Sequence, residues 1–198
     1  GVGEGDDGFV GWYLTASALG LYQLAFRLSN APATEITNVI HTLMFPTYSK
    51  LQNDIDALRD AFSKTLHMTF LATIPMAVGI ILVADPFVRI FLGDEWLPMV
   101  TAMEVMAVAG LFRAIVTTGS AVFRGTGAPQ WDFVSNAIRT LVIAVTIWPL
   151  TSRWGITGAA VSITLGISSA APLWLYKTHK ITTVPLREYA RSLILPVL

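Results

Sequence analysis

The stretch LYQLAFRLSNAPATEITNVIHTLMFPTYSK, residues 21–50, is too apolar for a soluble surface and too polar to face lipid on every side. At about 100° per residue, the polar side chains of a helix here share one stripe. The stripe comprises Gln23, Arg27, Asn30, Thr34, Asn38 and His41, with Glu35 and Thr42 on its flank. At about 1.5 Å per residue the helix reaches about 45 Å, enough to cross a bilayer with its headgroups. The pattern predicts a membrane helix with one wet face, as a transport cavity requires.

The composition of the whole chain also indicates a membrane protein. Of its 198 residues, 54% are hydrophobic and 13% are charged, and the mean hydropathy is +0.60. Soluble domains carry about 25% charged residues. The net charge is zero and no basic run alternates with aromatic residues, which argues against a nucleic-acid partner. The chain contains no cysteine, which excludes disulfides, thiolate metal sites and cysteine nucleophiles.

Further apolar segments follow the opening helix and predict an all-α, polytopic transmembrane helix bundle. They cover residues 68–84, 97–123, 130–152 and 156–176, and the start of another lies at residues 192–198. The last complete segment has a small residue at every fourth position, which favours close packing of helices. These small residues are Gly158, Ser162, Gly166 and Ala170.

The boundaries of the first two spans carry three local predictions. Asp85-Pro86 is expected to end the helix of residues 68–84, with residues 87–92 forming a short interfacial turn. Residues 51–67 are polar and amphipathic, which predicts an interfacial segment ahead of that span. Before the opening helix, a span over residues 8–26 and a turn near residues 17–20 fit the sequence equally well.

Lysine and arginine counts near the span ends predict the orientation of the chain. Eight lie on one side: Lys50, Arg59, Lys64, Arg124, Lys177, Lys180, Arg187 and Arg191. Arg89 and Arg153 lie on the other, alongside Asp85, Asp94 and Glu95. The first side is therefore expected in the cytoplasm, so the opening helix runs from the outside inwards.

Three arginines lie within the predicted spans: Arg27, Arg113 and Arg139. An arginine at the bilayer centre costs at least about 2.5–3.5 kcal/mol on insertion scales, so it usually faces a cavity or a partner. Two of them belong to polar stripes with four-three spacing: Arg113 with Thr117, Ser120 and Arg124, and Arg139 with Asp132, Asn136, Ile143 and Thr146. Cations on three wet faces favour an anionic substrate such as a phosphate or diphosphate, which arginine binds bidentately.

Structural roles are the alternative for these polar residues. Ion pairs can neutralise the cations: Arg27 with Glu35, and Asp132 or Glu104 with Arg139 or Arg113. A lone histidine such as His41 is more often a packing residue than a proton carrier.

Catalytic motifs are missing from the sequence. His67 and His179 lie in predicted interfacial or loop segments, and no zinc-protease, serine-hydrolase or P-loop pattern occurs. The sequence therefore predicts a transporter that is not an enzyme and needs neither a cofactor nor a metal.

Short runs across residues 7–178 carry a family resemblance. They are ALGLYQLAFRLSNAP, FPTYSKLQND, DIDALRDAFSKTL, ADPFVRIFLGDEW, FRGTGAPQW and WGITGAAVSITLG. Together they resemble the second half of polysaccharide and O-antigen flippases. These form the lipid-linked oligosaccharide branch of the multidrug/oligosaccharidyl-lipid/polysaccharide exporter superfamily. The resemblance implies one lobe of a two-lobe, alternating-access transporter, with about five spans and the start of a sixth.

The resemblance also implies how the chain is divided. Residues 1–198 are expected to form a single transmembrane lobe that is truncated at both ends. Residues 1–16 would hold the end of a lost span and a loop, which favours the turn near residues 17–20. Residues 17–178 would form the helical bundle, and residues 179–198 a basic linker and the start of the next span. The expected partners are membrane lipid and the missing first lobe of the same protein.

The implied function is transport in the cell membrane, for lipopolysaccharide O-antigen or other surface polysaccharide assembly. An oligosaccharide on polyprenyl diphosphate would be flipped from the cytoplasmic to the outer leaflet. The expected substrate-binding residues are Arg27, Asn38, His41, Arg113, Thr117, Asn136 and Arg139, with Glu35 and Asp132 secondary. The alternatives are a cation-coupled multidrug exporter of the same superfamily, which would favour cavity carboxylates, and a peptidoglycan-precursor flippase.

Overall fold

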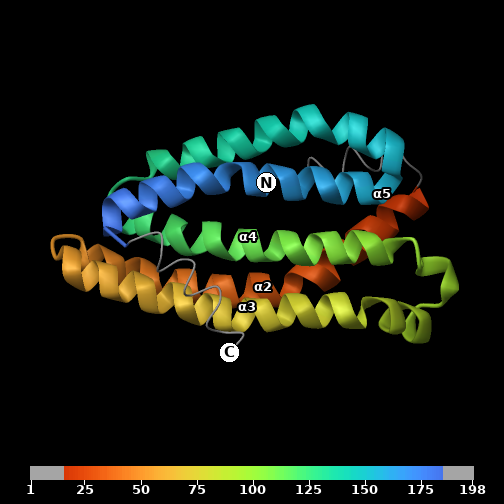
Figure 1. The fold of residues 1–198 in the computed structure, drawn as a ribbon, viewed down its shortest axis with the longest axis horizontal. Helices are drawn as coiled ribbons and strands as arrows, with labels where there is room; N and C mark the ends of the chain where they lie inside the picture. The colour runs from red at the N-terminus through yellow and green to blue at the C-terminus, as the bar shows by residue number, and fades with distance from the viewer. Residues whose placement is uncertain (1–15, 185–198) are drawn as a thin grey trace.

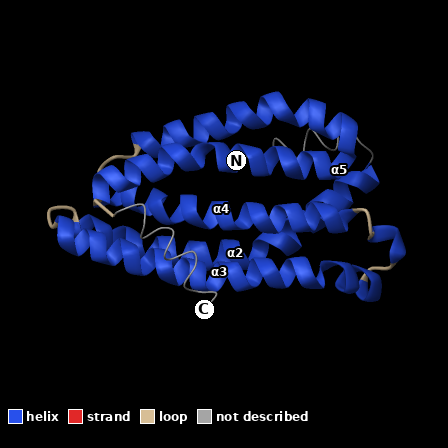
Figure 2. Cartoon of the chain, in the orientation of Figure 1, coloured by secondary structure: helices blue, strands red, loops and turns tan. Residues whose placement is uncertain are grey.

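The computed structural model describes residues 16–184, apart from the side chains of residues 16–19, 31–33, 36 and 41. Within this part the chain is helical and contains no strand (Figure 2). Its elements are α2 (Ala16–Leu51), α3 (Ile55–Phe91), the short 3-10 helix η1 (Asp94–Trp96), α4 (Met99–Gly125) and α5 (Gln130–Thr182). The long helices lie side by side as rods along the long axis of the molecule, which is horizontal in Figure 1.

Helix α5 contains a reversal that divides it into two arms. Gly155 has φ 55° and ψ −133°, a backbone conformation that is rarely open to other residues. The second arm therefore returns beside the first (Figure 1). The predicted spans of residues 130–152 and 156–176 are these two arms, and the short connection between them lies where the sequence places it.

The ladder of small residues holds the two arms together. A Cβ atom at Gly158 would lie 2.0 Å from the Leu150 oxygen, and one at Gly166 would lie 2.4 Å from Ile143 Cγ1. Between them, the hydroxyls of Ser162 and Thr146 are 2.7 Å apart. Because larger residues would force the arms apart, the ladder does what its spacing predicts.

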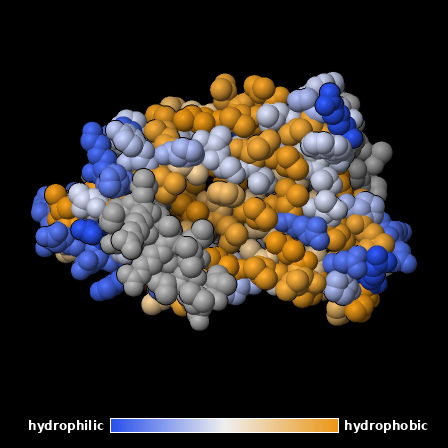
Figure 3. Space-filling view, in the orientation of Figure 1, coloured by the Kyte–Doolittle hydropathy of each residue, from blue (hydrophilic) through white to orange (hydrophobic). Residues whose placement is uncertain are grey.

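The chain is a multi-pass membrane protein. Among the described helices, α3, α4 and α5 are long and apolar enough to cross a membrane, and α5 can do so twice because of its reversal. Apolar residues cover the middle of the face in Figure 3, and hydrophilic residues gather at its two ends. Helix α2, which the sequence predicts to cross the membrane with one wet face, is not among these apolar helices in the described part of the chain.

Three sequence-based boundary predictions need correction. Helix α2 already includes residues 17–20, so the expected turn does not lie there. Helix α3 passes through Pro86 and ends only at Phe91, because a proline removes a single backbone donor and its neighbours can hold the helix together. Arg89 Nε donates to Asp85 Oδ2 at 2.8 Å across this proline. The linker was expected to begin at residue 179, but α5 continues to Thr182.

The amphipathic segment of residues 51–67 packs inside the bundle. Its apolar side chains Leu58, Phe62 and Leu66 are buried. They form one core with Phe123 and Trp174. Residues 55–67 of the segment are the first part of α3, and the buried part of its apolar face contacts protein where the sequence suggested a membrane surface.

Candidate functional site

A small polar pocket lies between α4 and both arms of α5. It has a volume of about 40 Å³ and is lined by Arg113, Val116, Thr117, Ser135, Asn136, Arg139, Ile167 and Ala170. Four of the seven expected substrate-binding residues therefore share one site: Arg113, Thr117, Asn136 and Arg139. Arg113 and Thr117 are four residues apart on α4, and Asn136 and Arg139 three apart on α5, so each pair lies on one helix face.

The position of Arg113 is fixed in part by α2. The guanidinium carbon of Arg113 lies 5.4 Å from the centre of the Phe26 ring, the geometry of a cation–π contact. Such a contact contributes about 0.5–2 kcal/mol, and more where water is excluded. The Arg113 side chain therefore reaches from α4 to α2 and links these two helices.

Ser135 completes the pocket and was missed in the sequence. It is only 3% exposed, and its hydroxyl has no hydrogen-bond partner among the described residues. A buried hydroxyl of this kind costs free energy unless a water or ligand satisfies it. Ser135 stands four residues before Arg139, so the stripe that predicted Arg139 also contained the signal for Ser135.

Asp132 sits at the edge of the same stripe and is held by α4. Its carboxylate accepts hydrogen bonds from Arg124, at 2.7 and 3.0 Å, and from the Ser120 hydroxyl at 2.9 Å. The Asn136 amide donates to the Asp132 backbone oxygen at 2.8 Å. This network is built from the two predicted stripes of α4 and α5, but it joins Asp132 to Arg124, a pair that the sequence did not predict.

The expected residues of α2 do not line this pocket. Arg27, Glu35 and Asn38 are exposed on α2, and Asn38 accepts a hydrogen bond from Thr42 through its backbone oxygen at 2.8 Å. His41 is part of α2, and its side chain lies outside the described residues. The polar residues thus divide into a pocket on α4 and α5 and an open face on α2.

Among the side chains that the structure describes, no group of three or more acidic or histidine residues could hold a metal ion. The polar residues that line the pocket are two arginines, a threonine, a serine and an asparagine. None of its lining residues is acidic, so the pocket as described has the chemistry to bind an anion.

The sequence of the chain identifies its family. The family described as "Polysaccharide biosynthesis protein" matches residues 2–101, just over half of the 198 residues. The chain belongs to this family. The predicted resemblance to polysaccharide flippases is thereby confirmed at the level of the family.

Two relatives with curated descriptions illustrate the family. The chain is 28% identical over 127 residues to the teichuronic acid biosynthesis protein TuaB of Bacillus subtilis (strain 168), a match that covers 62% of this chain and 26% of TuaB. It is 24% identical over 188 residues to the lipopolysaccharide biosynthesis protein WzxC of Escherichia coli (strain K12), covering 92% of this chain and 37% of WzxC. The chain thus spans much less than half of either relative.

A solved structure has the same fold. The lipid II flippase MurJ, in its inward closed conformation, matches with a TM-score of 0.78 and 18% sequence identity. The match covers 95% of this chain and 41% of MurJ. The described helices therefore form a polytopic bundle that corresponds to part of a larger membrane protein.

Proposed function

We propose that this chain forms one lobe of a transporter that flips an oligosaccharide linked to polyprenyl diphosphate from the cytoplasmic to the outer leaflet. The observation that carries the proposal is the pocket that Arg113 and Arg139 line together with Thr117, Ser135 and Asn136. Guanidinium groups bind phosphate oxygens bidentately, and hydroxyls and amides supply further donors. In a site partly shielded from water these contacts are stronger than at an exposed surface.

The family and the fold support the same substrate class. TuaB and WzxC are named for the biosynthesis of teichuronic acid and lipopolysaccharide. MurJ, whose fold the chain shares, is named as a flippase of a lipid. A membrane protein with an anion-binding pocket suits a lipid whose charged headgroup must cross the bilayer.

Charge reversal in the pocket tests the proposal. In the full-length protein, Arg113→Glu and Arg139→Glu are each expected to reduce surface polysaccharide at least tenfold while the amount of protein in the membrane stays the same. Lipid-linked precursor should accumulate in the cytoplasmic leaflet. Arg153→Glu is the matched control, because Arg153 is exposed at the reversal of α5, away from the pocket. Normal export by both pocket variants would refute the proposal.

The fold of MurJ favours flipping of a peptidoglycan precursor as the second candidate. A complementation experiment separates the two. If the full-length protein restores growth to cells depleted of their lipid II flippase, the second candidate gains support. If it restores only surface polysaccharide to an export mutant, the first does. A multidrug exporter is disfavoured because the lining residues of the pocket include two arginines and no carboxylate.

A further inference from the structure

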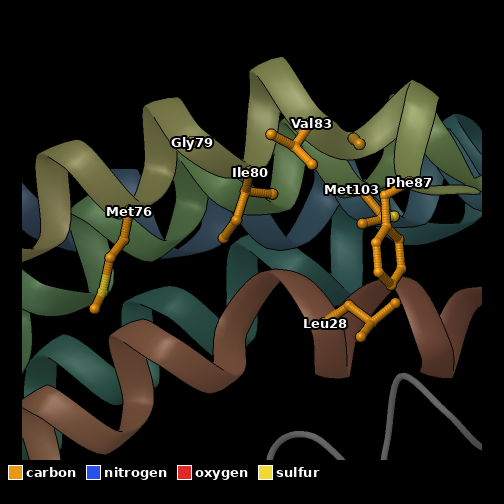
Figure 4. A pocket seen from close by; sticks show the side chains of 8 residues that line it. Leu28, Met76, Gly79, Ile80, Val83, Phe87 and Met103 are labelled. Carbon is orange, nitrogen blue, oxygen red and sulfur yellow. The ribbon is translucent and has the colours of Figure 1, made fainter.

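A groove lies between α2 and α3, apart from the polar pocket. The two helices leave their connection at residues 52–54 as neighbours, and α2 then packs mainly on α4 (Figure 1). Where α2 and α3 have separated, they leave an open space of about 450 Å³. Its lining residues are Leu28 of α2, Met76, Gly79, Ile80, Val83, Ala84 and Phe87 of α3, and Met103 of α4 (Figure 4).

The chemistry of this α2–α3 groove fits a hydrocarbon chain. Every lining side chain is apolar, and Met76 and Met103 can adjust to an irregular ligand. A Cβ atom at Gly79 would meet no atom within 4 Å, so the groove is open at its centre. From Met76 to Phe87 the groove follows α3 for about 16 Å at the usual rise of about 1.5 Å per residue. A chain of several isoprene units could lie along it.

A cation lies beside the groove on the same turn of α2. Leu28 lines the groove, and Arg27, the preceding residue, is exposed about 100° around the helix. About 100° further round, Phe26 carries the guanidinium group of Arg113 on its ring. On this one turn of α2, Leu28 therefore faces the apolar groove, Phe26 faces Arg113 of α4, and the exposed Arg27 lies between them. This arrangement complements a lipid that has an anionic headgroup and a long hydrocarbon tail.

We infer that the α2–α3 groove seats the polyprenyl tail of the transported lipid while its diphosphate contacts the cations beside α2. The inference rests on the proposed function and extends it, since it assigns the tail to a surface distinct from the headgroup pocket. The groove then contributes binding energy through the tail, which stays in an apolar environment. The cations contribute it through the headgroup, which crosses the bilayer.

The test compares two probes on the full-length protein in nanodiscs. One probe is a C55 polyprenyl diphosphate, and the other is dimethylallyl diphosphate, which has the same diphosphate and a single isoprene unit. Gly79→Phe places a ring in the groove and is expected to weaken binding of the C55 probe at least tenfold. Binding of dimethylallyl diphosphate should change less than twofold. The matched control is Val78→Phe, because Val78 is 48% exposed and is not among the groove residues.

Each outcome has a definite meaning. Unchanged C55 binding by Gly79→Phe would overturn the groove assignment and leave the proposed function standing. Failure of the parent protein to bind either probe would count against the proposed function itself. A large loss of thermal stability in Gly79→Phe, but not in Val78→Phe, would show that another helix of the full protein fills the groove, and would overturn the inference.

Photo-crosslinking gives a second measurement that does not depend on filling the groove. A photoreactive amino acid in place of Met76 should capture a radiolabelled C55 polyprenyl diphosphate, whereas the same residue in place of the exposed Leu71 should not. Capture of nanodisc phospholipid at Met76 that excess C55 probe fails to displace would identify an ordinary lipid site and overturn the inference.

Discussion

Gly166 lies where the two arms of α5 approach each other beside Arg139, so a single added methyl group tests how the pocket is held. A Cβ atom there would lie 2.4 Å from Ile143 Cγ1 and 3.1 Å from the Arg139 backbone oxygen. Ile143 is buried and the oxygen belongs to a helix backbone, so neither can move without displacing its neighbours. Overpacking of this kind costs about 1–3 kcal/mol, and Gly166→Ala should lower the free energy of unfolding by that amount.

The same contact predicts compensation by a second substitution. Ile143→Ala removes the clashing Cγ1 atom and alone should cost about 2–5 kcal/mol through the cavity that it leaves. The methyl group of Gly166→Ala would occupy part of that cavity. The double variant should therefore be at least about 1 kcal/mol more stable than the sum of the single effects, as residues in contact often show. Unfolding of the full-length protein in mixed micelles, followed by tryptophan fluorescence, measures all three; additivity within about 0.5 kcal/mol would refute the reasoning.

Export activity separates an effect on the pocket from a general loss of stability. Gly166→Ala pushes on the backbone of Arg139, so export per folded molecule should fall as well as stability. Gly158→Ala is the matched control, because its Cβ would clash with the Leu150 oxygen at 2.0 Å, near the reversal of α5 and away from the pocket. Equal export losses in both variants, after correction for folded protein, would show that the contact with Arg139 has no special effect.

Three further substitutions have expected outcomes. Ser135→Ala removes a buried hydroxyl, so stability should change by less than about 1 kcal/mol, while binding of dimethylallyl diphosphate to the full-length protein should weaken; unchanged binding would remove Ser135 from the site. Gly155→Ala should lower the free energy of unfolding by about 1–3 kcal/mol, because few other residues adopt φ 55° and ψ −133°, and an unchanged thermal midpoint would contradict this. Asp132→Asn should cost about 1 kcal/mol or less, since Arg124 is 51% exposed, and high salt should shrink the difference from the parent.

The helices could be predicted from the sequence because apolar runs report directly on membrane spans. Residues 97–123 and the two arms of α5 lie close to where hydropathy places them. Pro86 misled the prediction because a proline removes one backbone hydrogen bond but does not stop the following residues from packing. Val88, two residues beyond it, is fully buried. The first turns of α3 misled it because an amphipathic pattern does not reveal whether its apolar face meets lipid or protein.

The pocket could be predicted in part. Helical spacing showed which residues share a face, and two such faces, on α4 and α5, meet to bring Arg113 and Arg139 into one site. The stripe of α2 was equally clear, but which neighbour it faces could not be predicted, because the rotation of a helix against its neighbours is set by packing; Arg27 is exposed on α2 outside this pocket. The α2–α3 groove left no signal in the sequence, since it arises from the separation of two helices whose apolar residues look like any other lipid-facing surface.

The reversal at Gly155 has a consequence for how the chain is inserted during synthesis. Only Arg153, Trp154 and Gly155 separate the predicted spans, so in the orientation predicted from the sequence a single formal charge would be translocated with the connection. The hydroxyls of Thr146 and Ser162 hydrogen-bond to each other within α5. They therefore need no partner from another helix while they lie in the hydrocarbon layer. The two arms can therefore enter the bilayer together as a hairpin. Arg139 and Ile167, one from each arm, would then already lie on the same side of the future pocket. Packing of the hairpin against α4 would complete the pocket.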